Sequence, residues 1–427
     1  MEQTHVFYFV LANNSMNYGI GSYLNHLVSG LRHHRDIAVT IVHCLDEEHD
    51  RFLIEEQNGI RNIYIPKPAS RYINIFNSQH QTEKIKYAKR VRTLLEPIFE
   101  ELGTVVAHFN QSILSFLAEE LERSFNLKIV FTVHFLSWQF LYEKSLDEYS
   151  SAWQEVYGDK AFQVSIDPNE KIFCRISDQI ICLTEAAKNF VCAAYQCDPD
   201  KVKLIKNGIT LTLPKNEMDK MQLKKQLGFN ENDFVLVFVG RIAKSKGIKH
   251  IISAVNHLVS HHAKHNIKLL VAGSGNFDDL LPISGSIWNN VIFTGALHED
   301  QLHNAYLLAD AGITMSFFEQ CSYTALEMLR YDLPIIYANN DGLAEMLDGN
   351  PAAFKVDLDF NIKNGYHIDV DSICNHILNL MDKREKGIRF TQSGIKERFA
   401  IDLWIRDMLA IYTGLSKQIE REFEYVQ

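Results

Sequence analysis

Two cationic side chains stand in a turn that directly follows an apolar, β-branched run. Arg241 and Lys246 lie within residues 240–247 (GRIAKSKG), and the apolar run before them is residues 234–239. Arginine offers a planar fork of donors and lysine a mobile point charge, so the two together can neutralise a diphosphate. The alternative is an ordinary solvated basic turn. If Arg241 and Lys246 are considered without the rest of the sequence, the solvated turn is the favoured interpretation.

Two glutamates, Glu319 and Glu327, stand eight residues apart in the segment 316–327 (SFFEQCSYTALE). If Glu327 lies two turns into a helix, the carboxylates are up to about 12 Å apart, whereas two carboxyls that cleave one glycosidic bond need about 5–10 Å. The spacing suits two acceptors that hold hydroxyls at opposite ends of a long ligand, with the amides of residues 322–324 facing an anion between them. Alternatively, Glu319 complements a helix dipole and Glu327 is a surface residue, although an unpaired charge in the apolar run TALEML is costly.

Gly19 and Gly21 stand where the first predicted strand turns into a helix (NYGIGSYL). Glycines there let backbone amides approach an anion at the helix N-terminus, and a plain strand-to-helix turn is an equal alternative. The third glycine of a dinucleotide fingerprint is absent here, and it is absent again after residues 273–275 (GSG), where Asp278 takes its place. Without a GxxxxGK(S/T) loop either, the sequence argues against nicotinamide dehydrogenases and P-loop nucleotidases.

Short β-branched or aromatic runs alternate with helical segments and would position these residues. The strands predicted in the first half are residues 6–11, 38–43, 105–109, 129–133 and 179–183, with helices 20–31, 82–102 and 112–124 between them. The alternation restarts after residues 206–208, with strands at 234–239, 267–272, 291–293, 312–315, 335–337 and 353–356. It predicts parallel sheets covered by helices on both faces, hence two doubly wound α/β domains. Because such sheets bind ligands beyond the carboxyl ends of their strands, we expect the site in the cleft between the domains.

The expected domains are residues 1–205 and 206–394, followed by a helical segment, 395–427, without further strands. Residues 141–170 interrupt the alternation and look like an excursion from the first domain.

Composition bounds the class of protein. The 427 residues include 43 Lys and Arg against 53 Asp and Glu, a formal net charge of −10, which argues against a chain built to neutralise nucleic-acid phosphates. Seven cysteines, an odd number without CxxC spacing, predict reduced thiols rather than a disulfide framework or a zinc site. With no signal-peptide pattern and no apolar stretch of about 18 residues, we expect a cytoplasmic chain.

Eleven segments together resemble the retaining GT-B glycosyltransferases of family 4. In chain order they are GIGSYLNHLVSGL, VAHFN, FTVHF, EKIFCRISDQIICLTEA, IKNGI, GRIAKSKG, VAGSGNF, VIFTGAL, LLADAGITMS, EQCSYTALE and DGLAEML. The ordered set covers almost the entire chain. The resemblance implies two Rossmann-like domains facing across a cleft, and transfer of a sugar from a nucleotide-diphosphate donor with retention. The first domain would take the acceptor, the second the nucleotide sugar, and the last segment would cross back to the first domain.

The resemblance also implies roles for individual residues. Arg241 and Lys246 match the basic pair that holds the donor diphosphate. Glu319 matches the contact to hydroxyls of the donor sugar, and Glu327 the contact to the ribose. His134, in FTVHF, matches a histidine near the reacting sugar, so we expect it to be catalytic together with Arg241, Lys246 and Glu319. The residues expected to bind the donor besides Glu327 are Gly19, Gly21, Gly240, Ser322, Tyr323 and Thr324.

Two departures from the family pattern bear on the identity of the donor more than on the reaction. Residues 319–322 read EQCS where a Glu-Pro-Phe-Gly start is usual, and residues 341–342 read Asp-Gly where a double glycine commonly precedes the later glutamate, Glu345. The implied mechanism is attack from the face of the leaving group, with cations that stabilise the departing diphosphate in the transition state. It requires no metal and no cofactor, since the nucleotide sugar is a substrate.

Short acidic pairs and a histidine cluster are alternative metal sites. The pairs are Asp198/Asp200, Asp357/Asp359 and Asp369/Asp371, and the histidines are His257, His261, His262 and His265. We favour turns for the acidic pairs and a solvated helix face for the histidines.

A basic amphipathic segment, 82–92, is a candidate for contact with an anionic membrane. Its cations are Lys84, Lys86, Lys89, Arg90 and Arg92, with Ile85, Tyr87 and Val91 on a different side. A surface helix whose lysine stems pack on the protein is the favoured interpretation.

The expected partners are a nucleotide-sugar donor and a glycan, lipid-linked, small-molecule or peptide acceptor, without nucleic acid. Two alternative functions stay open, a non-catalytic glycosyltransferase-like binding protein and a sugar-nucleotide epimerase on the same fold. The presence of both glutamates and of the basic pair argues against the first.

Overall fold

The computed structural model describes residues 3–12, 19–68, 81–102, 104–157, 167–215, 218–392 and 394–424. They form two compact α/β units. Unit 1 comprises Met1–Gln139, Ser151–Gly208 and Ile401–Gln427, and unit 2 comprises Phe140–Ser150 and Ile209–Ala400. The chain therefore enters unit 2 twice.

Unit 1 is built on an eight-stranded sheet of order β3-β4-β2-β1-β5-β6-β7-β8. Its strands are β1 (Thr4–Leu11), β2 (Ile37–Asp46), β3 (Leu53–Gln57), β4 (Ile60–Pro66), β5 (Val105–Phe109), β6 (Lys128–Val133), β7 (Gln179–Cys182) and β8 (Val202–Leu204). Neighbouring strands pair in parallel except β3 and β4, which are antiparallel. β1 lies between β2 and β5, and its residues 6–10 are fully buried, as expected for a parallel strand covered on both faces.

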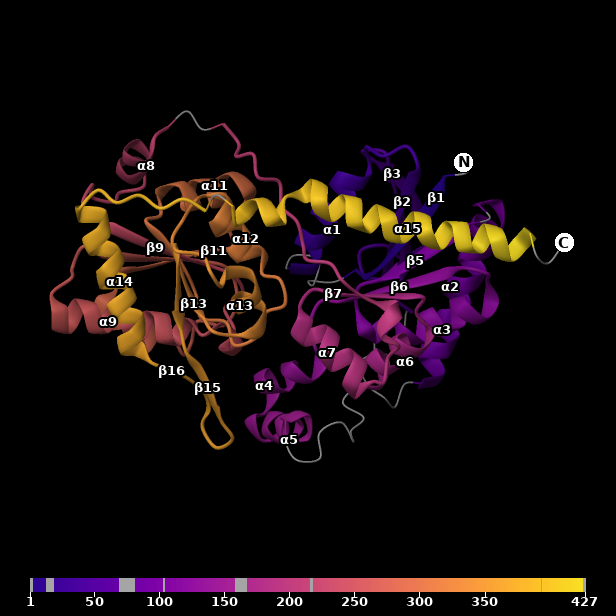
Figure 1. Cartoon of the computed structure of the whole chain (residues 1–427), viewed down its shortest axis with the longest axis horizontal. Helices are drawn as coiled ribbons and strands as arrows, with labels where there is room; N and C mark the ends of the chain where they lie inside the picture. Colours follow the sequence, from indigo (N-terminus) through magenta and orange to yellow (C-terminus); the bar gives the residue numbers. More distant parts are fainter. Residues whose placement is uncertain are drawn as a thin grey trace. The chain divides into compact units, whose positions relative to one another are not determined.

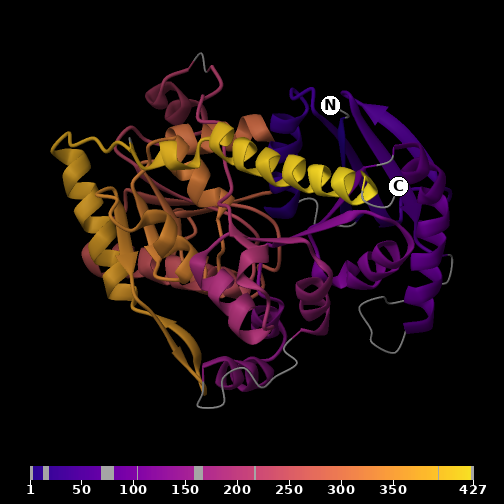
Figure 2. The same cartoon turned by 45° about the vertical axis from the view of Figure 1, so that its right-hand side comes forward.

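The last helix completes the core of unit 1. The helices of this unit are α1 (Gly19–Leu31), α2 (Gln81–Leu102), α3 (Ser115–Ser124), α6 (Pro168–Ile176), α7 (Glu185–Ala194) and α15 (Ile401–Glu424). In both views α15 runs beside α1 (Figures 1 and 2). Tyr412 of α15 forms 2.8 Å hydrogen bonds with Tyr8 of β1 and with His108 of β5, and all three side chains are buried. These contacts join the end of the chain to its first strand.

Unit 2 is built on a six-stranded parallel sheet of order β11-β10-β9-β12-β13-β14. Its strands are β9 (Phe234–Val239), β10 (Ile267–Ala272), β11 (Val291–Gly295), β12 (Ala311–Thr314), β13 (Ile335–Ala338) and β14 (Ala353–Val356). The chain adds strands on one side of β9 and then returns to add the others on the opposite side, which is the doubly wound order.

Helices cover both faces of this sheet, with α9 and α14 on one side and α11, α12 and α13 on the other (Figure 1). The helices of unit 2 are α4 (Leu141–Lys144), α8 (Lys220–Gln226), α9 (Ile248–His262), α10 (Leu281–Ser284), α11 (Glu299–Leu308), α12 (Tyr323–Arg330), α13 (Asp341–Leu347) and α14 (Val370–Glu385). Helix α5 (Leu146–Tyr157) begins in unit 2 and ends in unit 1. An antiparallel hairpin, β15 (Leu358–Asn361) and β16 (Gly365–Ile368), follows β14.

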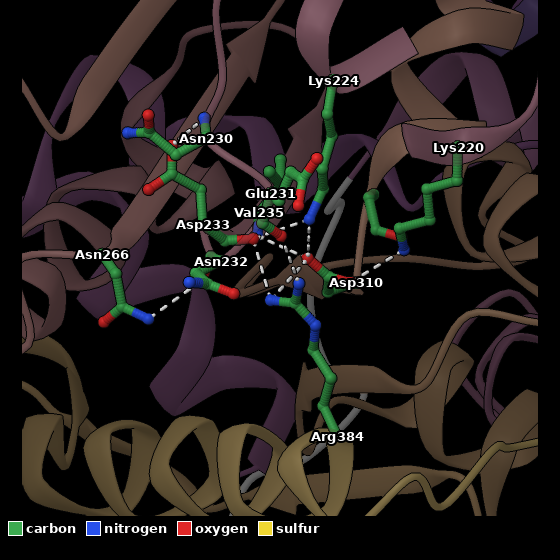
Figure 3. A network of polar contacts seen from close by, with 11 residues as sticks. Lys220, Lys224, Asn230, Glu231, Asn232, Asp233, Val235, Asn266, Asp310 and Arg384 are labelled. Atoms are coloured by element: carbon green, nitrogen blue, oxygen red, sulfur yellow. Dashed lines mark hydrogen bonds and ion pairs between the residues drawn. The ribbon is translucent and has the colours of Figure 1, made fainter. Parts of the chain in front are cut away.

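A charge cluster around the buried carboxylate of Asp310 lies at the amino ends of β9 and β12 (Figure 3). Lys224 Nζ stands 3.0 Å from Asp310 Oδ2, Lys220 Nζ 2.8 Å from Oδ1, and Arg384 Nη1 3.4 Å from Oδ2. The Val235 amide also donates to Asp310 Oδ2, at 2.9 Å. Burial raises the pKa of Asp310, but the charges of the two lysines outweigh it and hold the pKa below its ordinary value. This cluster fastens α8 and α14 to the sheet.

The two predicted doubly wound α/β folds are confirmed, and every predicted strand matches an observed strand to within three residues at each end. The prediction missed β3, β4, β8 and the hairpin β15–β16. Residues 141–170 were expected to be an excursion from the first domain, but Phe140–Ser150 belongs to unit 2, because its aromatic side chains pack there. Residues 158–166 of that segment lie outside the described residues.

Candidate functional site

Eight of the eleven predicted site residues lie at one edge of the unit 2 sheet. Gly240, Arg241 and Lys246 follow β9, while Glu319 and the start of α12 follow β12. β9 and β12 are neighbours whose connections lead to opposite sides of the sheet. A doubly wound sheet binds its ligand at the carboxyl ends of such a pair of strands.

The loop after β9 follows a path that two glycines make available. Gly273 approaches Gly240 so closely that a Cβ on Gly273 would stand 1.8 Å from the Gly240 carbonyl oxygen. Gly247 ends the 3₁₀ turn Lys244–Lys246 at φ +63°, where a Cβ would stand 2.1 Å from the Met315 carbonyl oxygen. A side chain at either position would displace the backbone of a neighbouring loop. The loop therefore presents Lys246 at a fixed place beside the loop that follows β12.

Lys246 and Glu319 form an ion pair there, with Nζ and Oε1 2.5 Å apart and side chains 25% and 15% exposed. Arg241 is partly exposed and forms no ion pair with any residue that the structure describes. At this edge of the sheet, Lys246 is thus paired with the Glu319 carboxylate, whereas Arg241 has no carboxylate partner within the described chain. Such a pair can accept further negative charge from a ligand.

The first turn of α12 is tied to its surroundings by side chains. Ser322 caps the helix and accepts the Ala325 amide at 3.4 Å, while the Ser322 amide donates to Met346 Sδ at 3.3 Å. The Ser322 amide was expected to face an anion. It does not, because the loop turns this amide towards α13. Thr324 Oγ1 donates to the Val239 carbonyl at 3.3 Å, which fixes the start of α12 at the end of β9.

Glu327 of α12 is only partly exposed and has a hydrogen-bond partner on α11, so its alternative as a surface residue is wrong. Tyr306 of α11 donates to Glu327 Oε2 at 2.6 Å, whereas Oε1 has no hydrogen-bond partner within the described chain. Burial raises the pKa of Glu327 to about 7, although the Tyr306 hydroxyl and the charge of Arg330 act against it. Tyr323, the first residue of the helix, is also buried. Glu327 is thus held by a partner, Tyr306, that sequence reasoning did not single out.

The start of α13 packs against the backbone of Glu319. Asn340 caps α13 by accepting the Leu343 amide at 3.0 Å, and its Nδ2 donates to the Ser316 carbonyl at 2.7 Å. A Cβ on Gly342 would stand 2.2 Å from the Glu319 carbonyl oxygen. Because of this close approach, position 342 requires glycine. Position 341, the other position of the double glycine in the expected pattern, is occupied by Asp341. The capping residue before Asp-Gly was the signal in the sequence that could have identified Asn340.

His134 follows β6 in unit 1 and is partly buried among polar and aromatic side chains. Its Nε2 is 2.9 Å from Asn110 Oδ1, and its ring meets that of Tyr23 edge-on at 4.5 Å. Burial lowers the pKa of His134 to about 3, so the imidazole is neutral at physiological pH. With the Asn110 oxygen as acceptor, Nε2 carries the proton and Nδ1 is left able to accept a hydroxyl hydrogen.

The two predicted glycines of unit 1 begin helix α1. Gly19 is its first residue and is exposed, and Gly21 is buried two residues before Tyr23, the ring that contacts His134. His134 and the start of α1 therefore lie together. Residues 13–18, which lead into this helix, lie outside the described residues.

Two of the three acidic pairs considered as alternative metal sites have structural roles. Asp198 accepts the Asp200 amide at 3.0 Å and caps the 3₁₀ turn Pro199–Lys201, while Asp369 accepts the Asp371 amide at 3.0 Å and caps α14. His257, His261 and His262 lie in the last two turns of α9 and His265 follows the helix. His261, His262 and His265 are exposed, as expected for a solvated face. Within the described ranges no group of three or more His, Cys, Asp or Glu side chains is placed to hold a metal ion.

Helix α2 carries the basic segment, with one difference from the expectation. Tyr87 and Val91 are buried, but Ile85 is 44% exposed, and Lys86 and Lys89 are exposed as well. The expected separation of apolar and basic sides was therefore wrong for Ile85, because the buried stripe follows Tyr87, Val91 and Leu95. No helix among the described residues has the length and apolarity needed to span a bilayer.

Two family models match the chain. The model described as Glycosyl transferases group 1 matches residues 219–396, and the model described as Glycosyltransferase Family 4 matches residues 18–213. The first match falls within unit 2 and the second within the region that contains most of unit 1.

Curated relatives and solved structures agree with these matches. An uncharacterized glycosyltransferase of Methanocaldococcus jannaschii is 29% identical over 245 residues, or 55% of this chain and 60% of the relative. A D-inositol 3-phosphate glycosyltransferase of Corynebacterium kroppenstedtii is 26% identical over 192 residues, or 42% of each chain. The match thus spans about half the length of these curated relatives.

The likeness to solved structures extends over nearly the whole chain and concerns the fold. Sucrose-phosphate synthase from Thermosynechococcus elongatus has a TM-score of 0.71 at 16% identity, covering 97% of this chain and 99% of that one. Anabaena HepE in complex with UDP-glucose has a TM-score of 0.65 at 14% identity, covering 96% and 99%.

Proposed function

Because the chain belongs to the group 1 glycosyltransferases of family 4 and has the GT-B fold, we propose that it transfers a sugar from a nucleotide-diphosphate donor to a hydroxyl-bearing acceptor, with retention. The observation that carries the proposal is the charge arrangement after β9 and β12. There Lys246 pairs with Glu319, and Arg241 has no carboxylate partner among the described residues.

The two cations act on the leaving group. As the bond between the sugar C1 and the diphosphate breaks, negative charge grows on the diphosphate oxygen. Arg241 and Lys246 stabilise that charge more in the transition state than in the bound donor, which lowers the barrier. The acceptor oxygen bonds to C1 on the same face, and its proton passes to the departing diphosphate. This route requires no metal ion, so transfer should persist in excess EDTA.

The carboxylates hold the two ends of the donor. Glu319, freed from Lys246 or shared with it, accepts hydroxyls of the sugar, and Glu327 Oε1 accepts a ribose hydroxyl while Tyr306 holds Oε2. The neutral His134 accepts a hydroxyl at Nδ1 and orients the reacting sugar. A uridine nucleotide is the first donor to test, because the similar fold of HepE was determined with UDP-glucose.

A thermal-shift series with UDP, GDP, UDP-sugars and GDP-sugars ranks the donors. A ligand at 100 times its dissociation constant should stabilise the chain by about 2.7 kcal/mol. Glu327→Ala should lose this shift, while Glu385→Ala, at an exposed position of α14, should keep it. The best donor is then incubated with acceptor pools, and the anomeric configuration of the product is read by NMR. Nucleotide binding without transfer or hydrolysis would favour a binding protein, and a changed sugar without any acceptor would favour an epimerase.

The acceptor is proposed only as a class. Among the relatives, one is named for D-inositol 3-phosphate and another, from Salmonella typhimurium, for lipopolysaccharide. Glycans, lipid-linked sugars, small hydroxyl compounds and peptides therefore form the test set. Contact with an anionic membrane through α2 stays a prediction. Binding to phosphatidylglycerol vesicles that is lost on Lys86→Glu with Lys89→Glu would support it.

A further inference from the structure

Residues Phe140–Ser150 leave unit 1 in sequence and pack within unit 2, beside the two loops that carry Lys246 and Glu319. The hairpin β15–β16 lies next to the same segment (Figures 1 and 2). No motif of the sequence pointed to this segment, and the reaction proposed above makes no use of it. Its contacts with the loop after β9 are nevertheless specific.

Ser245, the residue before Lys246, is held at both of its backbone groups. Its amide donates to Glu143 Oε1 at 2.9 Å, and its carbonyl accepts the Phe317 amide at 2.7 Å. Ser245 is 8% exposed, so these bonds are shielded from solvent. The Glu143 carboxylate therefore fixes the 3₁₀ turn from which the Lys246 side chain extends.

The neighbouring residue of the segment fixes the other loop. Tyr142 is 3% exposed and meets Phe317 edge-on at 5.4 Å and Phe318 at 5.9 Å. Phe318 directly precedes Glu319. The Tyr142 hydroxyl in turn accepts the Tyr366 amide at 3.4 Å, so the hairpin supports the ring from behind.

The far end of the segment is hydrogen-bonded to the hairpin, and the Tyr149 ring also lies 5.6 Å from that of Phe318. Ser150 Oγ donates to the Ile362 carbonyl at 2.9 Å, and the Tyr149 and Tyr366 hydroxyls are 2.5 Å apart. In the part of the chain that the structure describes, Ser150 forms no hydrogen bond with the loop that carries Lys246 or with the loop that carries Glu319. It offers a control within the same segment.

We propose that Glu143 is a positioning residue of the sugar-transfer site. Its carboxylate holds the turn at Ser245, so that Lys246 meets Glu319 in the geometry that stabilises the leaving diphosphate. The proposal rests on the function proposed above. It acts through a hydrogen bond to an amide rather than through charge, since a carboxylate near a diphosphate would repel it. A turn displaced by a fraction of an ångström lowers the rate of the chemical step more than it weakens binding.

The test compares Glu143→Ala, Glu143→Gln and Ser150→Ala in the full chain. We expect Glu143→Ala to lower kcat about tenfold with the donor KM changed less than about threefold, because the lost interaction matters most in the transition state. Glu143→Gln keeps the acceptor oxygen and should recover most of kcat. Ser150→Ala removes one hydrogen bond from the same segment and should leave kcat unchanged.

Amide hydrogen exchange of the peptide that contains residues 240–247 provides a readout that does not depend on activity. Protection should fall in Glu143→Ala and persist in Glu143→Gln and Ser150→Ala. Unchanged protection in Glu143→Ala would overturn the proposal, even if the wild-type chain shows no transfer and the function fails. Equal losses of kcat in Glu143→Ala and Glu143→Gln would assign the effect to charge and also overturn it. Equal losses in Glu143→Ala and Ser150→Ala would assign it to general stability.

Discussion

Two lysine–carboxylate pairs lie at opposite edges of the unit 2 sheet, and their surroundings differ. At the amino edge, Lys224 is 1% exposed and Asp310 6%, and the carboxylate is shared by three cations and a backbone amide. At the carboxyl edge, Lys246 and Glu319 are 25% and 15% exposed, and each is the other's sole ion-pair partner in the described chain. The first cluster is complete, whereas the second has capacity left for a ligand.

The difference shows how a fold separates charges for stability from charges for chemistry. A buried ion pair loses hydration on both members, so it persists only where hydrogen bonds and further charges replace the water. A pair at the end of two parallel strands keeps some hydration and can exchange a partner for a substrate. Stability should therefore depend on the amino edge and activity on the carboxyl edge.

The largest expected effect is the loss of stability in Asp310→Ala. This variant leaves Lys224 buried without a counter-charge, and breaking a buried pair in this way costs about 3–5 kcal/mol. Urea unfolding followed by circular dichroism measures the change. The transfer rate per folded molecule should stay at the wild-type value. A wild-type unfolding midpoint would show that the cluster does not stabilise the unit.

Lys246→Ala should show the opposite pattern. Loss of one group that stabilises the leaving diphosphate lowers kcat by about 10²–10³-fold, while removal of a partly exposed pair changes the unfolding free energy by less than about 1 kcal/mol. Lys249→Ala, which removes an exposed lysine three residues further on, is the matched control and should retain activity. If both variants transfer sugar equally well, the carboxyl edge is not the site.

Glu327→Gln tests whether the charge of a residue in the proposed site lowers the unfolding free energy of the protein. Burial raises the pKa of Glu327 from 4.5 to about 7, so the stability gained with the protonated form is present below pH 4.5 and is lost as the pH rises through about 7. Replacement by a neutral amide should therefore raise the unfolding free energy by about 1–2 kcal/mol at pH 8 and have little effect at pH 5. Thermal unfolding at the two pH values measures this, with Glu385→Gln as the exposed control. Equal shifts at both pH values would contradict the pKa argument. Nucleotide affinity should fall in the same variant.

The smallest effect is expected for Lys220→Met. This lysine is 40% exposed, and Asp310 keeps Lys224 and Arg384 in its absence, so the loss should be under about 1 kcal/mol and should shrink in high salt. Urea unfolding at low and high ionic strength separates the two contributions. A loss as large as that of Asp310→Ala would mean that the cluster acts as one unit rather than as a redundant set.

Local patterns in the sequence predicted the strands that carry the site and the place of its charged residues, because strand periodicity and loop position are set by near neighbours. One local signal was overlooked. Asn58 and Gly59, with φ of +52° and +75°, join β3 to β4, and Asn-Gly between two such runs is a strong hairpin signal.

Other features depend on contacts between distant segments and leave no local pattern. Tyr142 lies with Phe317, and Tyr306 is the partner of Glu327 across two helices, so neither could be assigned before the fold was known. The apolar run around Glu327 did indicate that some partner was needed. The Ser322 amide was misassigned because its direction depends on Met346 of the next helix.

The order in which the chain leaves the ribosome has a consequence for how the units form. All segments of unit 2 have been synthesised once Ala400 has emerged, whereas unit 1 still lacks Ile401–Gln427. The hydrogen bond between Tyr8 and Tyr412 joins residues 404 positions apart, so β1, which is synthesised first, can form this bond only after α15 has been synthesised. Unit 1 therefore receives its last helix only after every segment of unit 2 has been synthesised. A polypeptide cut after Gly208 would leave unit 1 without α15 and unit 2 without Phe140–Ser150.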